Sequence, residues 1–289
     1  MRFGLMYSNI GVAVQPEGAA AIASHAEALG FDSLWTVEHV VVPAVYASTY
    51  PYRSDGRIPG GPDSPIPDPL IWLSWVAART ERILLATGML ILPQRSPVVL
   101  AKELATLDVL SGGRTILGAG LGWLREEFAA IGVPFERRGR RLEEAIAVMR
   151  TLWAEDRPSF AGEFFRFEDA RMWPKPPRRR IPVVLGGHTE AAARRAGRIA
   201  DGYFPGRSHP EHLAPLLAAL RAGAEEAGRD PSAIEITVGT RPDPAAVDAL
   251  RGLGVDRVLI APRGADLPGV IGGMESAAST LRDAVGAEP

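Results

Sequence analysis

Cysteine is absent from this 289-residue sequence. Its absence excludes disulfide bonds, thiolate metal ligands and cysteine nucleophiles. The histidines show neither H-x-H nor H-E-x-x-H spacing, so a metal site is not expected. The sequence also has no G-x-S-x-G motif, which argues against a hydrolase whose serine nucleophile lies on a strand-to-helix turn.

Long apolar runs and an excess of charge are lacking as well. No run of about eighteen apolar residues occurs, so we expect no transmembrane helix and no membrane partner. Residues 1–7 have no charged region followed by an apolar stretch and a cleavage site, so they do not resemble a signal peptide, and the expected compartment is the cytoplasm. The formal net charge is −2 and basic residues are spread along the chain, apart from Arg178–Arg180, so no nucleic-acid partner is expected.

The sequence does contain a regular alternation of short apolar runs and amphipathic segments. Apolar residues make up 46% of the chain and charged residues 23%, a balance that allows a large buried core. The predicted strands are Arg2–Ser8, Asp32–Val37, Ile83–Ile91, Arg114–Ala119, Ile181–Leu185, Gly202–Phe204, Ile234–Val238 and Arg257–Ile260. The predicted helices are Pro16–Leu29, Pro69–Arg79, Pro97–Leu110, Arg140–Trp153, Thr189–Ile199, Glu211–Ala227, Pro244–Leu253 and Leu267–Leu281.

Eight strand–helix pairs in one series predict an α/β fold with a parallel sheet, and eight is the number that closes a (β/α)8 or TIM barrel. An open doubly wound sheet is the alternative. That fold carries a glycine-rich phosphate motif after its first strand, where Asn9–Val12 offers a single glycine. We therefore expect one barrel domain over residues 1–289.

Two segments interrupt the alternation. Residues 40–68 follow the second strand and are rich in proline, glycine and tyrosine, whereas residues 158–180 precede the fifth strand. Structureless insertions of this length commonly act as lids or binding loops. Because barrel enzymes place their sites at the carboxyl ends of the strands, the first insertion is expected to cover the mouth and to shape a substrate pocket with an aromatic rim and a cationic contact. The residues expected there are Tyr46, Tyr50, Tyr52 and Arg53.

Two short motifs lie at the second and third strands. Glu38-His39 ends the second strand, and a histidine there can donate a proton or a hydrogen bond at neutral pH. The alternative is a histidine with a purely structural hydrogen bond. Thr87-Gly88-Met89 lies towards the end of the third strand, where a glycine marks a bulge, a close approach of a ligand or a simple bend.

Two glycine-rich motifs follow the fourth and fifth strands. Gly118–Trp123 has three alternate glycines, so a flat ring or a phosphate could contact main-chain amides, with Trp123 stacking on the ring or packing on the barrel rim. Gly186-Gly187-His188-Thr189 joins a strand to a helix and suits an anion, although an ordinary N-cap at Thr189 explains it equally well. The acidic residues form no evident acid–base pair.

Three stretches together resemble the bacterial luciferase-like superfamily and, within it, the deazaflavin-dependent oxidoreductases. The stretches are Phe31–Val40 (FDSLWTVEHV), Thr80–Phe128 (TERILLATGMLILPQRSPVVLAKELATLDVLSGGRTILGAGLGWLREEF) and Ile181–Pro205 (IPVVLGGHTEAAARRAGRIADGYFP). The resemblance implies a barrel that binds coenzyme F420, or alternatively FMN, with the ring in the mouth and the phosphate-bearing tail toward the fifth strand.

The resemblance also implies roles for single residues. His39 would face the ring and assist proton movement as a catalytic residue, and Glu38 would hold the acidic position before it. Thr87-Gly88 matches the site of a non-proline cis peptide behind the ring. The other implied cofactor-binding residues are Gly120, Leu121, Gly122 and Trp123 along the ring and ribityl chain, and Gly186, Gly187, His188 and Thr189 at the phosphates. Sugar-phosphate dehydrogenases of this class carry glutamate in place of Trp123, which argues against that substrate class.

The resulting hypothesis is an F420-dependent oxidoreductase that transfers a hydride between the deazaflavin and a small organic substrate. One alternative is an FMN-dependent monooxygenase that needs a dry pocket and a reductase partner. Another is a non-catalytic cofactor-binding barrel. Because such relatives commonly pair through outer helices, a homodimer is expected.

Overall fold

The computed structural model describes residues 1–285, so the last four residues of the predicted domain lie outside the described residues. Eight parallel strands form a closed ring in which each pairs with its neighbours. In spatial order they are β3 (Leu84–Thr87), β2 (Ser33–Thr36), β1 (Arg2–Met6), β11 (Arg257–Ile260), β10 (Glu235–Thr240), β9 (Gly202–Pro205), β8 (Val183–Gly187) and β5 (Thr115–Gly120). The pairing of β3 with β5 closes the ring. The predicted (β/α)8 barrel is confirmed.

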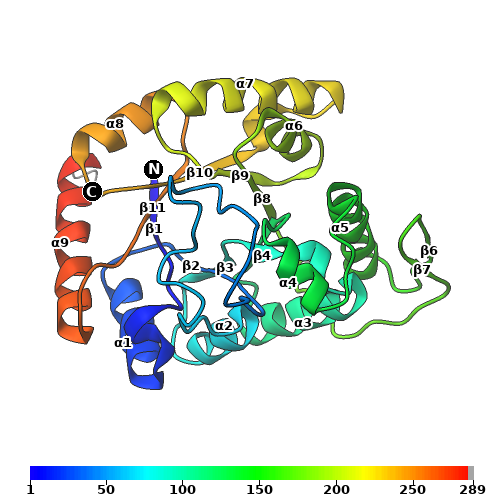
Figure 1. The fold of residues 1–289 in the computed structure, drawn as a ribbon, viewed down its shortest axis with the longest axis horizontal. Coiled ribbons are helices and arrows are strands. Elements are labelled where there is room, and N and C mark those ends of the chain that lie inside the picture. The colour runs from blue at the N-terminus through cyan, green and yellow to red at the C-terminus, as the bar shows by residue number, and fades with distance from the viewer. Residues whose placement is uncertain (286–289) are drawn as a thin grey trace.

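Helices surround the strands (Figure 1). They are α1 (Pro16–Ala28), α2 (Pro69–Ala77), α3 (Pro97–Leu110), α5 (Arg138–Ala154), α6 (Glu190–Ile199), α7 (Pro210–Glu226), α8 (Pro244–Gly252) and α9 (Leu267–Val285). Most begin where the sequence supplies a start signal. Pro69, for example, is the first residue of α2, and the Asp68 carboxylate accepts hydrogen bonds from the amides of Leu70 and Ile71. Within the described residues, none of the helices combines the length and the apolar character that a membrane span requires.

The core has two parts, one inside the ring of strands and one between the strands and the helices. The inner part is small and consists of Trp35, Ala86, Ile116, Val184 and Leu259, with Met6, Leu84, Met89 and Phe204 packed against it. Trp35 is fully buried, and its ring meets that of Phe204 edge-on at 5.6 Å. This packing fills the barrel and positions the strand ends at its mouth.

Four local features differ from the prediction. The strand expected at Ile83–Ile91 is split into β3 and β4 (Leu90–Ile91), and the break coincides with a cis peptide between Gly88 and Met89, one bond later than implied. The insertion at residues 158–180 is not structureless, since it carries a hairpin of β6 (Phe160–Ala161) and β7 (Arg166–Phe167). A short helix, α4 (Arg125–Ala130), was not predicted. Three short 3-10 turns complete the elements: Gly11–Val14, Leu92–Gln94 and Pro231–Ala233.

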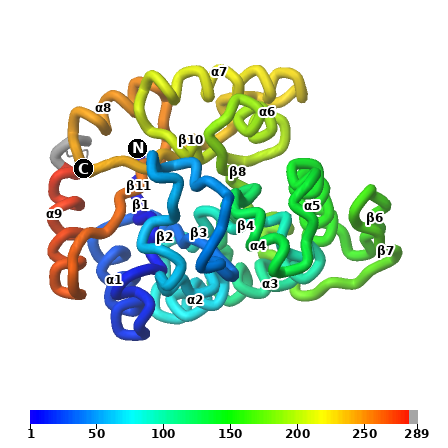
Figure 2. Tube along the Cα trace, viewed as in Figure 1, coloured from blue at the N-terminus to red at the C-terminus, as the bar shows by residue number. Residues whose placement is uncertain are grey.

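Residues 40–68, called the lid below, contain turns but no helix or strand. In Figures 1 and 2 the lid, drawn in blue, crosses in front of the strands, whereas the β6–β7 hairpin projects at the far side of α5. A long irregular segment needs partners for its backbone polar groups, and the lid finds several of these on α4.

Candidate active site at the barrel mouth

The carboxyl ends of β2 and β5 bring His39 and Trp123 together. Their ring centroids lie 5.8 Å apart in an edge-on arrangement. The lid adds two aromatic rings, since Tyr46 and Tyr50 lie edge-on to Trp123 at 5.6 Å and 5.2 Å. Residues separated by more than seventy positions thus form one aromatic cluster beside the histidine.

The far part of the lid reaches the turn after β8. The Tyr52 hydroxyl lies 3.4 Å from Nδ1 of His188, and the two rings meet edge-on at 5.2 Å. A side chain at Gly206 would not fit there, because an added Cβ would lie 2.2 Å from the Tyr52 ring. The lid therefore spans the mouth from Trp123 to His188. Arg53, the expected cationic contact, is half-exposed and pairs with Asp55.

The alternate glycines of β5 and β8 surround Met89. An added Cβ at Gly120 would lie 3.2 Å from Cβ of Met89, and one at Gly186 would lie 2.8 Å from its Cγ. These glycines therefore make room for a side chain of the protein, a neighbour that the sequence did not reveal. Because Met89 is only half-buried, it also forms part of the surface at the mouth.

Thr87 joins β3 to β5. Its buried hydroxyl donates to the Gly118 carbonyl at 2.7 Å and accepts from the Gly118 amide at 3.0 Å. Since both bonds are internal, the side chain supports the wall of the barrel. A direct contact of Thr87 or Gly88 with a cofactor stays a prediction.

The turn after β8 has the predicted shape. The Thr189 hydroxyl accepts a hydrogen bond from the Ala192 amide at 3.2 Å and caps α6, as the simpler interpretation of the motif expected. Burial lowers the pKa of His188, which leaves it uncharged at neutral pH. Anion binding by Gly186, Gly187, His188 and Thr189 stays a prediction.

Glu38, the acidic neighbour of His39 in the sequence, points elsewhere. Its buried carboxylate accepts from the Ile91 amide at 2.5 Å and from Nε of Arg95 at 2.9 Å. The Arg95 guanidinium also donates to the Asp68 carboxylate at 2.8 Å, and Asp68 caps the N-terminus of α2. Burial raises the pKa of Glu38, an effect that Arg95 opposes. The observed contacts of Glu38 are therefore structural, and a catalytic role for it stays a prediction.

The acid that meets His39 comes from α4. Oε2 of Glu127 lies 3.0 Å from Nδ1 of His39, and Oε1 accepts from the amides of Val40 at 2.6 Å and Val41 at 3.3 Å. Burial alone would raise the pKa of Glu127, but the hydrogen bonds from His39 and the Val40 amide outweigh it and lower the pKa. Sequence reasoning missed this pair because the residues lie 88 positions apart. The only signal was an acidic first turn after the glycine-rich loop.

The preceding residue, Glu126, holds the lid. Its carboxylate accepts from the Ala47 amide at 2.7 Å and from the Ser48 hydroxyl at 2.7 Å. The hydrogen bond from Ser48 lowers the pKa of Glu126 to about 2. Two consecutive glutamates of one short helix thus fix the start of the lid and His39.

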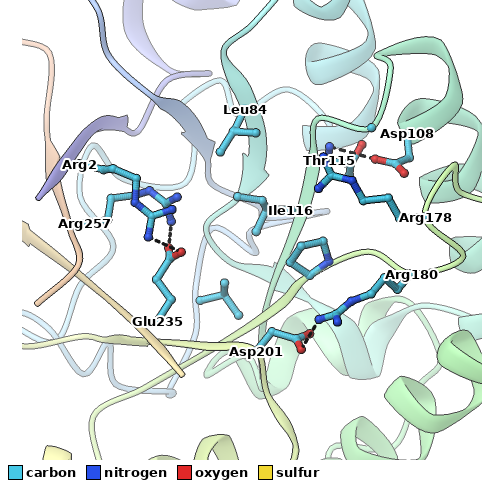
Figure 3. Close-up of a pocket in the computed structure, with 13 residues that line it drawn as sticks. Arg2, Leu84, Asp108, Thr115, Ile116, Arg178, Arg180, Asp201, Glu235 and Arg257 are labelled. Carbon is cyan, nitrogen blue, oxygen red and sulfur yellow. Dashed lines mark hydrogen bonds and ion pairs between the residues drawn. The ribbon is translucent and has the colours of Figure 1, made fainter. Parts of the chain in front are cut away.

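A cavity of about 160 Å³ opens at the opposite end of the barrel (Figure 3). Its lining comes from the first residues of strands, such as Arg2, Leu84 and Arg257, and from α3 and the loops before the strands, and it includes none of the predicted site residues. Its charges pair among themselves, for example Arg2 with Glu235 at 2.6 Å and Arg180 with Asp201 at 2.8 Å. Nor do the described residues include a cluster of histidine and acidic side chains that could hold a metal ion.

Comparison with known proteins places this geometry in a family. Residues 1–248 match the sequence profile of the luciferase-like monooxygenases. The chain belongs to this family, as the resemblance indicated. It is a family of oxidoreductases that use F420 or FMN.

Several relatives are informative. The chain is 36% identical over 230 residues to an F420-dependent glucose-6-phosphate dehydrogenase of Kineococcus radiotolerans, covering 77% of this chain and 63% of that protein. It is 33% identical over 262 residues to an uncharacterised Mycobacterium tuberculosis protein, covering 90% and 91%. Among solved structures, a monooxygenase from Streptomyces bottropensis superposes with a TM-score of 0.81 at 26% identity, covering 99% and 100% of the two chains. An F420-dependent secondary alcohol dehydrogenase, at 0.78 and 20% with 98% and 99% covered, shares the fold.

Proposed function

We propose that this protein is an F420-dependent oxidoreductase that transfers a hydride between the deazaflavin and a small organic substrate. The observation that carries the proposal is His39, held by a buried carboxylate and set against Trp123 where the glycine-bearing strands end. Sequence identity to F420-dependent glucose-6-phosphate dehydrogenases, at 36% and 33%, supports the choice of cofactor.

The residues present fit a flat cofactor with an anionic tail. The strand ends at Gly120 and Gly186 are half-buried, lack side chains and lie on the two sides of Met89, so main chain and thioether form one surface. Gly120 to Trp123 would hold the ring, and Gly186 to Thr189, at the start of α6, would hold the phosphates. When bound, the deazaflavin supplies two-electron hydride chemistry.

The part of the protein is to orient the substrate, to exclude water and to hold a proton. His39 lies against Trp123 at the mouth, and imidazole is the side chain that most often serves as a general acid or base. The lid aromatics lie beside it, and the Tyr50 hydroxyl is neutral at neutral pH, more so because burial raises its pKa to about 12. A neutral aromatic wall favours an apolar or aromatic substrate over a highly charged one.

The substrate is therefore proposed to differ from that of the Kineococcus relative, whose name specifies glucose 6-phosphate. Trp123, with Tyr46 and Tyr50 against it, offers aromatic surface instead of a carboxylate. This makes sugar phosphates a poor match for the site.

An FMN-dependent monooxygenase is the second candidate, because the Streptomyces monooxygenase matches nearly the whole chain with a TM-score of 0.81. It would require a reductase to deliver reduced FMN. Titration of the purified apoprotein with F420 and, separately, with FMN separates the candidates by fluorescence. Micromolar affinity for F420 and weaker affinity for FMN is the expected result. Binding of FMN without F420 would favour the monooxygenase, and binding of neither would leave the family's chemistry unsupported in this chain.

We also propose that the protein is a homodimer. Large apolar side chains stand exposed on two neighbouring helices, with Ile71 of α2 and Leu110 of α3 each 74% exposed. Trp75 of α2 and Val99 of α3 are exposed as well. Exposed apolar patches of this kind mark protein–protein contacts.

A further inference from the structure

We propose that Glu127 is a positioning residue that keeps the proton of His39 on Nδ1 and thereby makes Nε2 the nitrogen that exchanges a proton at the barrel mouth. The tautomer is a property of the protein alone. Only its consequence for turnover rests on the proposed function.

Both carboxylate oxygens of Glu127 form hydrogen bonds. Its side chain is fully buried, and Oε1 accepts from the main-chain amides of Val40 and Val41. A main-chain amide can only donate, so Oε1 must act as an acceptor. This fixes the rotation of the carboxylate and directs Oε2 at His39.

One proton lies between Oε2 of Glu127 and Nδ1 of His39, which are 3.0 Å apart. A carboxylate surrounded by donors stays ionised and has no proton to give. The hydrogen atom therefore belongs to Nδ1 of the imidazole. This holds whether His39 is neutral or protonated, since both forms can carry hydrogen on Nδ1.

The proton on Nδ1 determines the state of the other ring nitrogen, Nε2. With Nδ1 protonated, the lone pair of neutral His39 is on Nε2, and the charged form gains its second proton there. Within the described part of the chain, Nε2 forms no hydrogen bond. The ring of Trp123 also packs edge-on against the His39 ring, at an interplanar angle of 82°. Nε2 is thus the atom left for a bound molecule.

Glu38 cannot substitute for Glu127 in this role. Its oxygens accept hydrogen bonds from the Ile91 amide and the Arg95 guanidinium. Glu38, next to His39 in the sequence, therefore has a structural role. Glu127, 88 positions away, determines which nitrogen of His39 carries the proton.

The test uses Glu127→Gln. The amide side chain of this variant would turn its carbonyl oxygen to the Val40 and Val41 amides, because those amides need an acceptor. Its NH2 group would then face Nδ1 of His39 as a donor. His39 would have to accept through Nδ1, which moves the proton of the neutral ring to Nε2. A change of one atom is thus expected to reverse the tautomer without disturbing the fold.

The measurement is nitrogen NMR of the full-length protein labelled at histidine, without cofactor, with the His39 signals assigned from their loss in His39→Asn. Wild type should show neutral His39 protonated at Nδ1, and Glu127→Gln should show it protonated at Nε2. Glu126→Gln is the matched control, because it makes the same change one residue earlier, where the partner is Ser48. His39 should keep the wild-type tautomer in this control.

A second measurement determines kcat and the cofactor Kd of wild type and of Glu127→Gln, with the cofactor that the titration identifies, F420 or FMN. Glu127→Gln is expected to lower kcat by at least about tenfold, with the cofactor Kd unchanged, since general acid–base steps contribute factors of this size or more. An Nε2-protonated wild type, or an unchanged tautomer in Glu127→Gln, would overturn the proposal. A reversed tautomer with undiminished kcat would overturn the positioning role. If neither cofactor binds, the proposed function fails, while the tautomer is still decided by NMR.

Discussion

Replacing Gly186 by alanine tests why the strand ends carry glycine. The added Cβ would lie 2.8 Å from Cγ and 3.1 Å from Sδ of Met89, closer than packed atoms tolerate. Overpacking of this kind costs about 1–3 kcal/mol. Alanine recovers about 0.4–1 kcal/mol by restricting the unfolded chain. We therefore expect Gly186→Ala to lower the free energy of unfolding by about 1.3 kcal/mol, the difference between the middles of the two ranges.

The effects of substitutions at Gly186 and Met89 on the free energy of unfolding should be strongly coupled. Met89→Ala removes the side chain that the new methyl group would strike, so Gly186→Ala should cost much less in that background. The coupling energy should be about 0.5–3 kcal/mol, the range for residues in contact. Urea unfolding of the four proteins of this cycle, without cofactor, provides the measurement. Gly272→Ala in α9, where nothing lies within 4 Å of the added Cβ, serves as the control and should stabilise slightly.

Equal costs of Gly186→Ala in the two backgrounds would refute the account, because they would show that the methyl group strikes something other than Met89. The double variant also separates two reasons for the glycine. If it binds F420 as well as Met89→Ala does, the glycine serves internal packing. If binding stays weak, the cofactor itself needs the bare main chain.

Three further predictions address the wall, the lid and the surface. Thr87→Val should lower the free energy of unfolding by about 1–3 kcal/mol, because both bonds to Gly118 are lost, whereas Thr87→Ser should keep most of it; thermal unfolding measures both. Glu126 has a folded-state pKa of about 2 against 4.5 for the free group, so its stabilisation is present above pH 4.5 and lost as the pH falls toward 2. Glu126→Gln should flatten the acid dependence of Tm over that window, and an unchanged slope would contradict the assignment. Ile71→Glu should yield monomers in light scattering, while Val45→Glu, also highly exposed but on the lid, should not.

The fold could be predicted because each strand and helix of a barrel has its own local pattern of apolar residues. Each strand and the helix after it bury their own apolar residues, as the buried residues of α2 after the Asp68 cap show. The alternation can therefore be recognised in the sequence without knowing which distant residues touch. His39 and Trp123 could be placed at one mouth for the same reason, since strand polarity alone fixes which end of the barrel a residue occupies.

The partner of His39 could not be predicted this way. In the sequence, Glu127 looks like any acidic residue in the first turn of a helix, and Glu38 is the nearer candidate. Only the three-dimensional path of the lid brings the amide of Val40 and the ring of His39 onto Glu127. Met89 belonged to a predicted motif, but its position between the glycines of β5 and β8 was missed for a related reason, since those glycines are on two other strands.

The two adjacent glutamates of α4 divide the lid into parts that differ in their freedom to vary. Residues 39–48 are tied to a single helical turn, so an insertion there would pull either His39 or the Ser48 contact out of place. The outer stretch at residues 59–63 is largely exposed, and its turn depends on Gly60 and Gly61, which both have a φ of +79°. Loop grafting or lengthening aimed at new substrates should therefore begin there, where the chain can be rebuilt without disturbing the histidine.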